Sequence, residues 1–494
     1  MTYEECRRQY PEFYYERAQA DETADRIDLT YTFTIPGLDT FRPTWSIPKS
    51  PRFPGRALDD PIVQRMIFYL GMVELVSYWK ITCSPTVHIP AGALDAESIA
   101  WWKKQYFYGL GEFFYVNSIA AQEDSFMTIL SEGCTTADNS GEAGCPSGCA
   151  PLALDGKPML GDAPEGTSQD GRNKPWPLDG CLIPIGGGKD SAVTLELLRS
   201  HKATNACFII NPRGATLETA RVAGYSGSSL LTLSRTLDPA MLERNRQGYL
   251  NGHTPFSALV AFSSVLTAYL NGKRFVVLSN ESSANESTVQ GSEVNHQYSK
   301  SVQFEEDFIR YERKYIGSGV SYFSLLRPWS ELQIARYFSN LKPYHAVFRS
   351  CNAGSKQDIW CGKCPKCLFV YLILSPFLST EELTGIFGRN LLEDESLLPL
   401  LEKLTGLLPE KPFECVGSRE EVNTAICMTI DRMQREGETI PPLLREYMGR
   451  PLYEDYRNRS NPYDHYFESH HFLPAQFERL MRDASKPAKE ESVC

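Results

Sequence analysis

The feature that most constrains the fold is a run of three glycines between a strand-like segment and a helix-like one. Residues 181–185 (CLIPI) have the pattern of a buried strand and residues 190–198 (DSAVTLELL) that of a helix, joined through Gly186-Gly187-Gly188-Lys189. Glycines allow a tight turn, and the free amides at the start of a helix bind phosphate. The sequence therefore predicts a phosphate-binding loop, the alternative being a glycine-rich turn without a ligand.

This loop differs from a Walker P-loop. Asp190 follows the lysine, where the Walker motif requires Ser or Thr. An acidic residue beside a phosphate cradle is favourable if Mg²⁺ lies between them. We therefore expect a magnesium-dependent phosphate site of another kind.

The rest of the central region predicts an α/β fold. Short apolar runs alternate with helical patterns, which is typical of βαβ units and a parallel sheet. Further strands are predicted at 207–210 and 275–278, and a buried helix at 256–270. Asn211, Pro212 and Arg213 follow the first of these strands and Asn280 and Glu281 the second, so they should line a ligand crevice.

Composition divides the chain into four parts. The first contains a helix predicted at 61–79 and the aromatic segment 101–117, which is either a core helix or a ligand wall. Ser379 with Glu382, and Ser418 with Glu421, fit capping boxes at helix starts in the last part. We predict an N-terminal α+β domain, a Gly/Pro/Ser-rich insertion or linker, a Rossmann-like nucleotide-binding domain and a helical C-terminal region at 1–130, 131–178, 179–375 and 376–494.

Charge and cysteine content narrow the function class. With 50 Lys and Arg against 61 Asp and Glu, the net charge is −11, which disfavours nucleic acid and anionic membranes as partners. No apolar run reaches the roughly 20 residues of a membrane span, and the N-terminus lacks a signal-peptide pattern. The 14 cysteines are therefore expected to be reduced thiols and metal ligands in a cytoplasmic protein.

Four cysteines have the spacing of a metal site. Cys351, Cys361, Cys364 and Cys367 form C-x9-C-x2-C-x2-C, the full complement of a structural zinc site. An iron–sulfur cluster or four free thiols are the alternatives. Three further cysteines in the insertion suggest either a second metal site or unpaired thiols, at Cys134, Cys145 and Cys149.

A polar block follows the strand predicted at 275–278. It contains SNESSANEST (279–288) and VNHQYSKS (294–301), and therefore His296, Tyr298 and Lys300. Asn, Glu, His, Tyr and Lys next to a strand end favour a site over a solvated loop.

At the glycine loop the chain resembles the PP-loop ATP pyrophosphatases, whose signature is Ser-Gly-Gly-x-Asp-Ser. Gly186 stands where that signature has Ser, so a hydroxyl contact to pyrophosphate is lost. The resemblance implies a PP-loop parallel sheet that cleaves ATP between its α and β phosphates. The cysteine cluster is similar to that of the 7-cyano-7-deazaguanine synthases of this superfamily, where the metal is structural.

Longer segments resemble the UDP-N-acetylmuramoyl-L-alanyl-L-glutamate epimerases of peptidoglycan synthesis. The resemblance extends from about residue 60 to 430, except for the insertion. It is carried by YLGMVELVSYWK (69–80), WWKKQYFYGLGEF (101–113), GGGKDSAVTLELL (186–198), GYLNGHTPFSAL (248–259), SNESSANEST, VNHQYSKS, SCNAGSK (350–356) and KPFECVG (411–417).

This resemblance implies that the terminal L-Glu of UDP-MurNAc-L-Ala-L-Glu is adenylated by ATP, epimerised to D-Glu and released with AMP and diphosphate. ATP, Mg²⁺ and structural Zn²⁺ are the implied cofactors. Gly186, Gly187, Gly188 and Ser191 would hold the phosphates, with Lys189 stabilising the leaving pyrophosphate and Asp190 binding Mg²⁺. Further nucleotide contacts are expected from Asn211, Pro212, Arg213 and Asn280.

The acid and base of this reaction stay open. The first candidates are Glu281, His296, Tyr298 and Lys300, with Cys415 and Cys351 as secondary ones. Candidate clamps for the anionic substrate are Arg235, Arg244, Arg246 and Arg327. The alternatives are an ATP-dependent ligase or amidating enzyme of the 7-cyano-7-deazaguanine synthase type, and a nucleotide-binding module without catalysis. The oligomeric state stays open.

Overall fold

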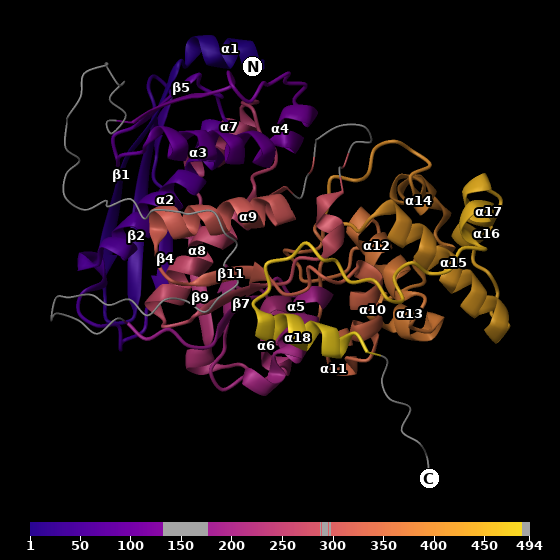
Figure 1. The fold of residues 1–494 in the computed structure, drawn as a ribbon. Coiled ribbons are helices and arrows are strands. Elements are labelled where there is room, and N and C mark those ends of the chain that lie inside the picture. Colours follow the sequence, from indigo (N-terminus) through magenta and orange to yellow (C-terminus); the bar gives the residue numbers. More distant parts are fainter. Residues whose placement is uncertain (132–175, 287, 289–294, 296–297, 487–494) are drawn as a thin grey trace.

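The computed structural model describes residues 1–131, 176–286, 288, 295 and 298–486. In this part of the chain, eleven strands form one continuous sheet. Their bounds are Glu12–Glu22 (β1), Arg26–Ile35 (β2), Asp39–Phe41 (β3), Thr44–Pro48 (β4), Thr86–Ile89 (β5), Thr128–Ser131 (β6), Cys181–Pro184 (β7), Ala206–Ile210 (β8), Leu230–Thr236 (β9), Phe275–Leu278 (β10) and Ser321–Ser324 (β11). The order is β11-β10-β7-β8-β9-β4-β2-β1-β5-β6, with β3 paired to β2 (Figure 1).

The five strands from β7 to β11 are parallel to one another, as the alternating pattern predicts. The strands predicted at 181–185, 207–210 and 275–278 are confirmed within one residue at each end. The N-terminal part mixes antiparallel pairs (β1–β2, β2–β4) with the parallel pairs β1–β5 and β5–β6. The protein is thus a mixed α/β protein with a largely parallel sheet.

The two parts of the sheet meet at an antiparallel pairing of β4 with β9, where Trp45 lies opposite Arg235. Fully buried Glu74 accepts two hydrogen bonds of 2.7 Å from the Arg235 guanidinium and one of 3.1 Å from the Trp45 indole. The boundary predicted at 178/179 therefore falls inside a single sheet, and the four-part division stays a prediction. The Arg235 guanidinium is ion-paired with a buried carboxylate and has a structural role in this fold, and its predicted role as an anion clamp stays a prediction.

The helices cover both faces of the sheet. Those of the first half are Tyr3–Gln9 (α1), Pro61–Trp79 (α2), Ala96–Gly109 (α3), Gly111–Val116 (α4), Lys189–Leu197 (α5), Gly214–Val222 (α6), Pro239–Arg246 (α7), Phe256–Leu270 (α8) and Val302–Tyr311 (α9). The later ones are Glu331–Ser339 (α10), Lys342–His345 (α11), Pro365–Leu374 (α12), Thr380–Phe387 (α13), Leu398–Thr405 (α14), Arg419–Glu436 (α15), Pro442–Met448 (α16), Pro451–Tyr456 (α17) and Ala475–Ala484 (α18).

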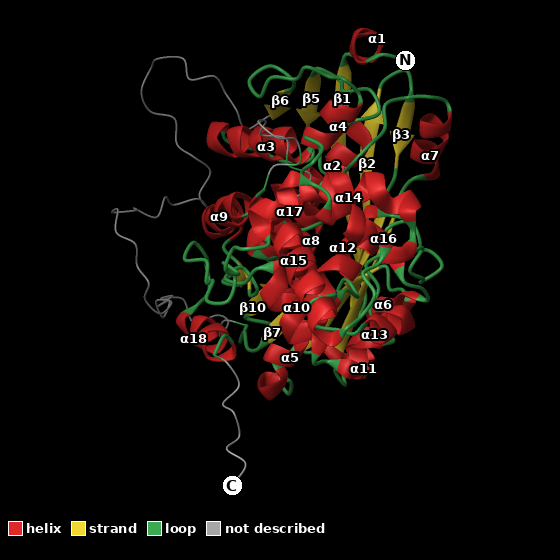
Figure 2. Ribbon diagram, turned by 90° about the vertical axis from the view of Figure 1, so that its right-hand side faces the viewer, coloured by secondary structure: helices red, strands yellow, loops and turns green. Residues whose placement is uncertain are grey.

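Alternate side chains of the parallel strands enter two different cores, as the two-residue period of a strand requires. On β10, Val276 and Leu278 pack with α2 and α8, whereas Val277 packs with α10, α12 and α15. In Figure 2 these last three helices lie in front of the sheet. Phe477 of α18 covers the edge, with its ring 5.1 Å from that of Phe275 and 4.8 Å from that of Phe323.

The aromatic segment 101–117 forms the end of α3 and all of α4. Trp102, Tyr106 and Phe113 are buried in the core with α2 and α8, so the core interpretation is confirmed for these residues. Across the described residues, no helix combines the length and the apolar character needed to cross a membrane.

Candidate active site

The glycine run forms the turn from β7 into α5. Gly187 has a φ of +81°, and a Cβ at this position would lie 3.1 Å from Ala215, so glycine is required both by conformation and by space. Gly188 is the N-cap of α5 and has no side chain with which to cap the helix. The Gly186 amide donates a 3.0 Å hydrogen bond to Ser191 Oγ. The remaining amides of the first turn of α5 therefore form the anion-binding end of a helix.

Lys189 points into the protein instead of along the loop. Its side chain is 4% exposed, and its ammonium pairs with Asp190 (2.5 Å) and with Glu331, the first residue of α10. Burial alone would lower the pKa of Lys189. The two carboxylates have the larger effect and raise this pKa above its ordinary value, so the lysine is charged. Burial likewise raises the pKa of Glu331, against the opposing charge of Lys189. The structure thus places Lys189 between carboxylates, and its predicted contact with pyrophosphate stays a prediction.

The first turn of α10 joins those of α5 and α15 at Glu331. The Glu331 amide at the start of α10 donates to the Glu421 carboxylate at 2.7 Å. The other oxygen of Glu421 accepts from the Ser418 amide at 2.7 Å, which confirms the capping box predicted at the start of α15. The first turns of α5, α10 and α15 therefore lie together, and their dipoles favour the negative charges that Asp190, Glu331 and Glu421 already supply there.

The loop after β10 forms a second wall at the carboxyl edge of the sheet. Asn280 donates to Ser324 Oγ at 3.0 Å, and Glu281 is 6% exposed. Arg327, fully buried, donates to the Glu281 carbonyl (2.6 Å) and the Lys300 carbonyl (2.5 Å) and pairs with Glu305 at 2.9 Å. Arg327 therefore joins two predicted site segments and is not the predicted clamp for a substrate anion.

The KPFECVG segment contacts this loop from the C-terminal region. The Glu286 carboxylate is held by Lys411 at 2.5 Å and Arg419 at 3.2 Å. This contact brings Cys415 to Lys300, whose ammonium donates to the Cys415 thiol at 3.0 Å. The VNHQYSKS and KPFECVG segments, more than a hundred residues apart in the sequence, thus meet near Asp190 of the glycine loop.

The residues predicted for adenosine lie at the end of β8. Asn211 has a φ of +48°, and its amide exchanges two 2.8 Å hydrogen bonds with the Arg235 backbone, so this side chain is already satisfied. Pro212 and Arg213 are exposed just before α6. All three residues are exposed at this edge, although the Asn211 amide is committed to the Arg235 backbone.

Tyr298, a further predicted site residue, lies in the buried core. The Tyr298 hydroxyl accepts a 3.3 Å hydrogen bond from Gln105, and its ring stacks on Tyr108 in the buried aromatic cluster. His296 lies outside the described residues, as do Cys134, Cys145 and Cys149. Of the other candidate clamps, Arg244 pairs with Asp39 and Arg246 with Glu243, so neither faces the site.

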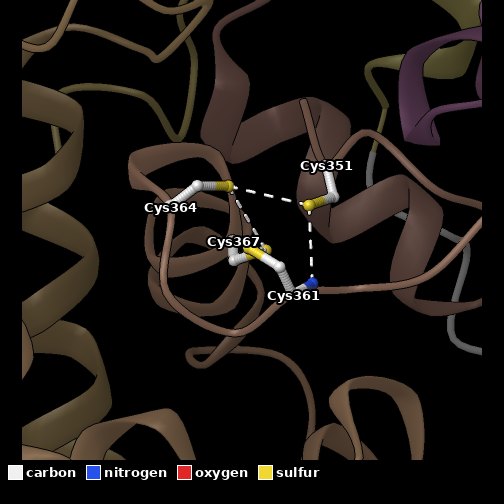
Figure 3. A group of neighbouring side chains, drawn as sticks. All are labelled: Cys351, Cys361, Cys364 and Cys367. Atoms are coloured by element: carbon white, nitrogen blue, oxygen red, sulfur yellow. Dashed lines mark hydrogen bonds between the residues drawn. The ribbon is translucent and has the colours of Figure 1, made fainter. Parts of the chain in front are cut away.

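The four spaced cysteines come together, as the sequence predicts (Figure 3). Their sulfurs lie within 4.8 Å of one another, with Cys351–Cys364 and Cys361–Cys367 at 3.7 Å and Cys364–Cys367 at 3.5 Å. Sulfurs about 2.3 Å from one tetrahedral ion would be about 3.8 Å apart. The group therefore fits a single four-coordinate ion better than a multi-iron cluster, which would hold the thiolates farther apart.

Glu331 is not among the site residues predicted from the sequence. Its position could have indicated a site, because the segment LRPWSE (326–331) follows strand β11 and leads into a helix capped by Ser330 and Gln333. Charged residues at the carboxyl end of a parallel strand are candidate site residues for the same reason as Glu281.

This geometry defines a class: an α/β protein whose charged and polar side chains gather at the carboxyl edge of its parallel sheet, where open α/β sheets bind their ligands. Family models match nearly the whole chain, as the MurL N-terminal domain over residues 4–145 and 157–325 and the MurL C-terminal domain over 347–454. No solved structure matches.

Three relatives carry the name UDP-N-acetyl-alpha-D-muramoyl-L-alanyl-L-glutamate epimerase. The one from Xanthomonas oryzae pv. oryzae is 34% identical over 412 residues, which is 82% of this chain and 83% of the relative. The Salinispora tropica protein is 36% identical over 370 residues (74% and 73%), and that of a Micromonospora species 40% over 259 (51% and 57%). The chain therefore belongs to the UDP-N-acetyl-alpha-D-muramoyl-L-alanyl-L-glutamate epimerase family, whose members are isomerases.

Proposed function

We propose that this protein converts the terminal L-Glu of UDP-MurNAc-L-Ala-L-Glu to D-Glu for peptidoglycan synthesis, cleaving ATP to AMP and diphosphate as it does so. Family membership supports the epimerisation. The observation that supports the use of ATP is the glycine loop, whose helix N-terminus converges with those of α10 and α15 on the charged group of Lys189, Asp190 and Glu331.

The chemistry explains why ATP would be needed. The α-proton of glutamate is a very weak acid, because its removal beside a carboxylate creates two adjacent negative charges. Joining that carboxylate to AMP cancels its charge and makes the α-carbon resemble that of an ester. A base can then remove the proton, an acid can return one to the other face, and water can release AMP.

The proposed roles follow from position. The amides of Gly187 and Gly188 and the start of α5 bind the phosphates of ATP in the manner of a PP-loop. Asp190 is partly exposed in the first turn of α5, so one of its hard carboxylate oxygens fits Mg²⁺, which would neutralise phosphate charge. Exposed Pro212 and Arg213 are placed for the nucleoside. Glu281 and Lys300 lie on the opposite wall, where proton transfer is proposed.

For the cysteine group we propose a structural Zn²⁺ ion. Four thiols with these separations fit a closed tetrahedral site, which leaves no position for substrate. Two backbone amides, those of Gly354 (3.1 Å) and Cys361 (3.4 Å), donate to Cys351 Sγ and would stabilise a thiolate. The ion would fasten residues 351–361 to the start of α12, behind the Lys366–Cys415 contact.

Exchange of labelled pyrophosphate into ATP tests the adenylation step. With Mg²⁺ and UDP-MurNAc-L-Ala-L-Glu, we expect label to enter ATP, because a reversible carboxylate adenylation returns pyrophosphate to the nucleotide. UDP-MurNAc-L-Ala, which lacks the glutamate, is the control and should give no exchange. Exchange without any substrate would contradict the proposal, and formation of an amide that requires ammonia would favour the ligase alternative.

A further inference from the structure

Cys415 and Lys300 form a thiol–ammonium pair, with the carboxylates of Glu281 and Asp190 near the lysine. The Lys300 ammonium donates to Cys415 Sγ at 3.0 Å, and both residues are half-buried, so they are shielded but reachable. Cys415 does not belong to the group of four clustered thiols. It is therefore available for chemistry that the metal ligands cannot perform.

The polypeptide holds this pair in a fixed place. The Cys415 carbonyl accepts a hydrogen bond from the Lys366 ammonium at the start of α12, and the neighbouring Glu414 carboxylate accepts one of 3.0 Å from the Lys366 amide. On the other side, the Lys300 carbonyl accepts from buried Arg327, which also holds the Glu281 carbonyl. A reacting group fixed in this way needs little reorganisation when substrate binds.

The Lys300 ammonium favours a thiolate at Cys415, against the nearby carboxylates of Glu281, Asp190 and Glu414. Although burial lowers the pKa of Lys300, the neighbouring Cys415, Glu281 and Asp190 raise it overall, so the lysine is an ammonium at neutral pH and cannot accept a proton. An adjacent ammonium favours the thiolate form of a cysteine, which is the reactive one. Between the two, the sulfur is the group able to act as a base.

We infer that Cys415, positioned by Lys300, is the catalytic residue that exchanges the substrate α-proton on one face of the activated glutamyl group. The inference rests on the proposed function. The thiolate sulfur forms a bond to hydrogen as the Cα–H bond breaks, and the released electron pair moves into the adjacent carbonyl as an enolate. In the reverse direction the thiol returns that proton to the same face. Protonation of the opposite face requires a second acid.

Cys415→Ala tests the inference by separating adenylation from proton transfer. We expect pyrophosphate exchange to stay within about threefold of wild type, because the glycine loop is untouched. Formation of D-Glu, and uptake of solvent deuterium at the glutamyl α-carbon, should fall at least about 100-fold, as for loss of a general acid–base group. Cys427→Ala, which removes a buried thiol of α15 outside the site, is the matched control and should keep both activities.

The role of Lys300 is tested by a pair of variants. Lys300→Arg keeps a charged donor beside the thiol and should recover part of the epimerisation, whereas Lys300→Met should lose it while pyrophosphate exchange continues. The inference is overturned if Cys415→Ala forms D-Glu at the wild-type rate, or if it loses exchange and epimerisation equally, which would indicate a structural role. Wild-type protein that forms no D-Glu with ATP would instead refute the proposed function itself.

Discussion

Asp190→Asn should abolish ATP-dependent turnover while leaving the protein folded. Asparagine has nearly the same shape, but it removes the charge that pairs with Lys189 at 2.5 Å and that we propose for Mg²⁺. Without that charge the metal is not held against the phosphates at the loop. We expect AMP formation in the presence of substrate to fall at least about 100-fold, as for loss of a group that stabilises transition-state charge.

The matched control is Glu218→Gln on α6, which removes an exposed carboxylate whose partner is Arg221 one turn away on the same helix. The Glu218→Gln variant should form AMP at the wild-type rate. Nucleotide affinity, measured by calorimetry with and without Mg²⁺, shows whether the Asp190 variant has lost the metal-dependent part of binding. If Asp190→Asn formed AMP at the wild-type rate, the assignment of Asp190 as the Mg²⁺ ligand would be contradicted. If the wild-type protein bound nucleotide but never cleaved it, the non-catalytic alternative would be favoured.

Cys364→Ser should remove a metal ion and loosen the region around it. Purified wild-type protein is expected to contain about one zinc ion per chain, and the variant close to none, because three thiolates and a hydroxyl form a much weaker site. The midpoint of thermal unfolding should fall by several degrees, since the ion would tie the 351–361 segment to α12.

Elemental analysis and differential scanning calorimetry measure these two effects. Cys427→Ala, whose thiol lies outside the cluster, should retain the metal and its unfolding midpoint. Unchanged zinc in Cys364→Ser would contradict the four-cysteine site. Stoichiometric iron with inorganic sulfide in the wild-type protein would show that the iron–sulfur alternative is the correct one.

Local sequence signals predicted much of the fold around the site. The helices α2 and α8 begin and end at the predicted residues, 61–79 and 256–270, because apolar periodicity and flanking residues define them. The capping boxes at Ser379 and Ser418 are confirmed for the same reason. The clustering of the four cysteines could be predicted from their spacing in the sequence, since tight turns can bring closely spaced thiols together.

Features that depend on distant segments could not be predicted. The β4–β9 pairing, which makes one sheet of two predicted parts, is set by the burial of Glu74 between Trp45 and Arg235 and leaves no short-range pattern. Arg235 and Arg327 resemble anion clamps in sequence, yet in the fold both are ion-paired with buried glutamates, Glu74 and Glu305 respectively. Glu331 could not be predicted because its contacts, with Lys189 of α5 and Glu421 of α15, form only when the first turns of these helices and of α10 come together.

We propose that this protein inverts a glutamyl α-carbon only while it consumes ATP. One incubation with ATP, Mg²⁺ and UDP-MurNAc-L-Ala-L-Glu tests it, with AMP and pyrophosphate quantified and the chirality of glutamate determined after acid hydrolysis. We expect D-Glu together with AMP and pyrophosphate, and none of the three when ATP is left out. Glutamate that stays in the L form with ATP present, or D-Glu that forms equally well without ATP, would contradict it.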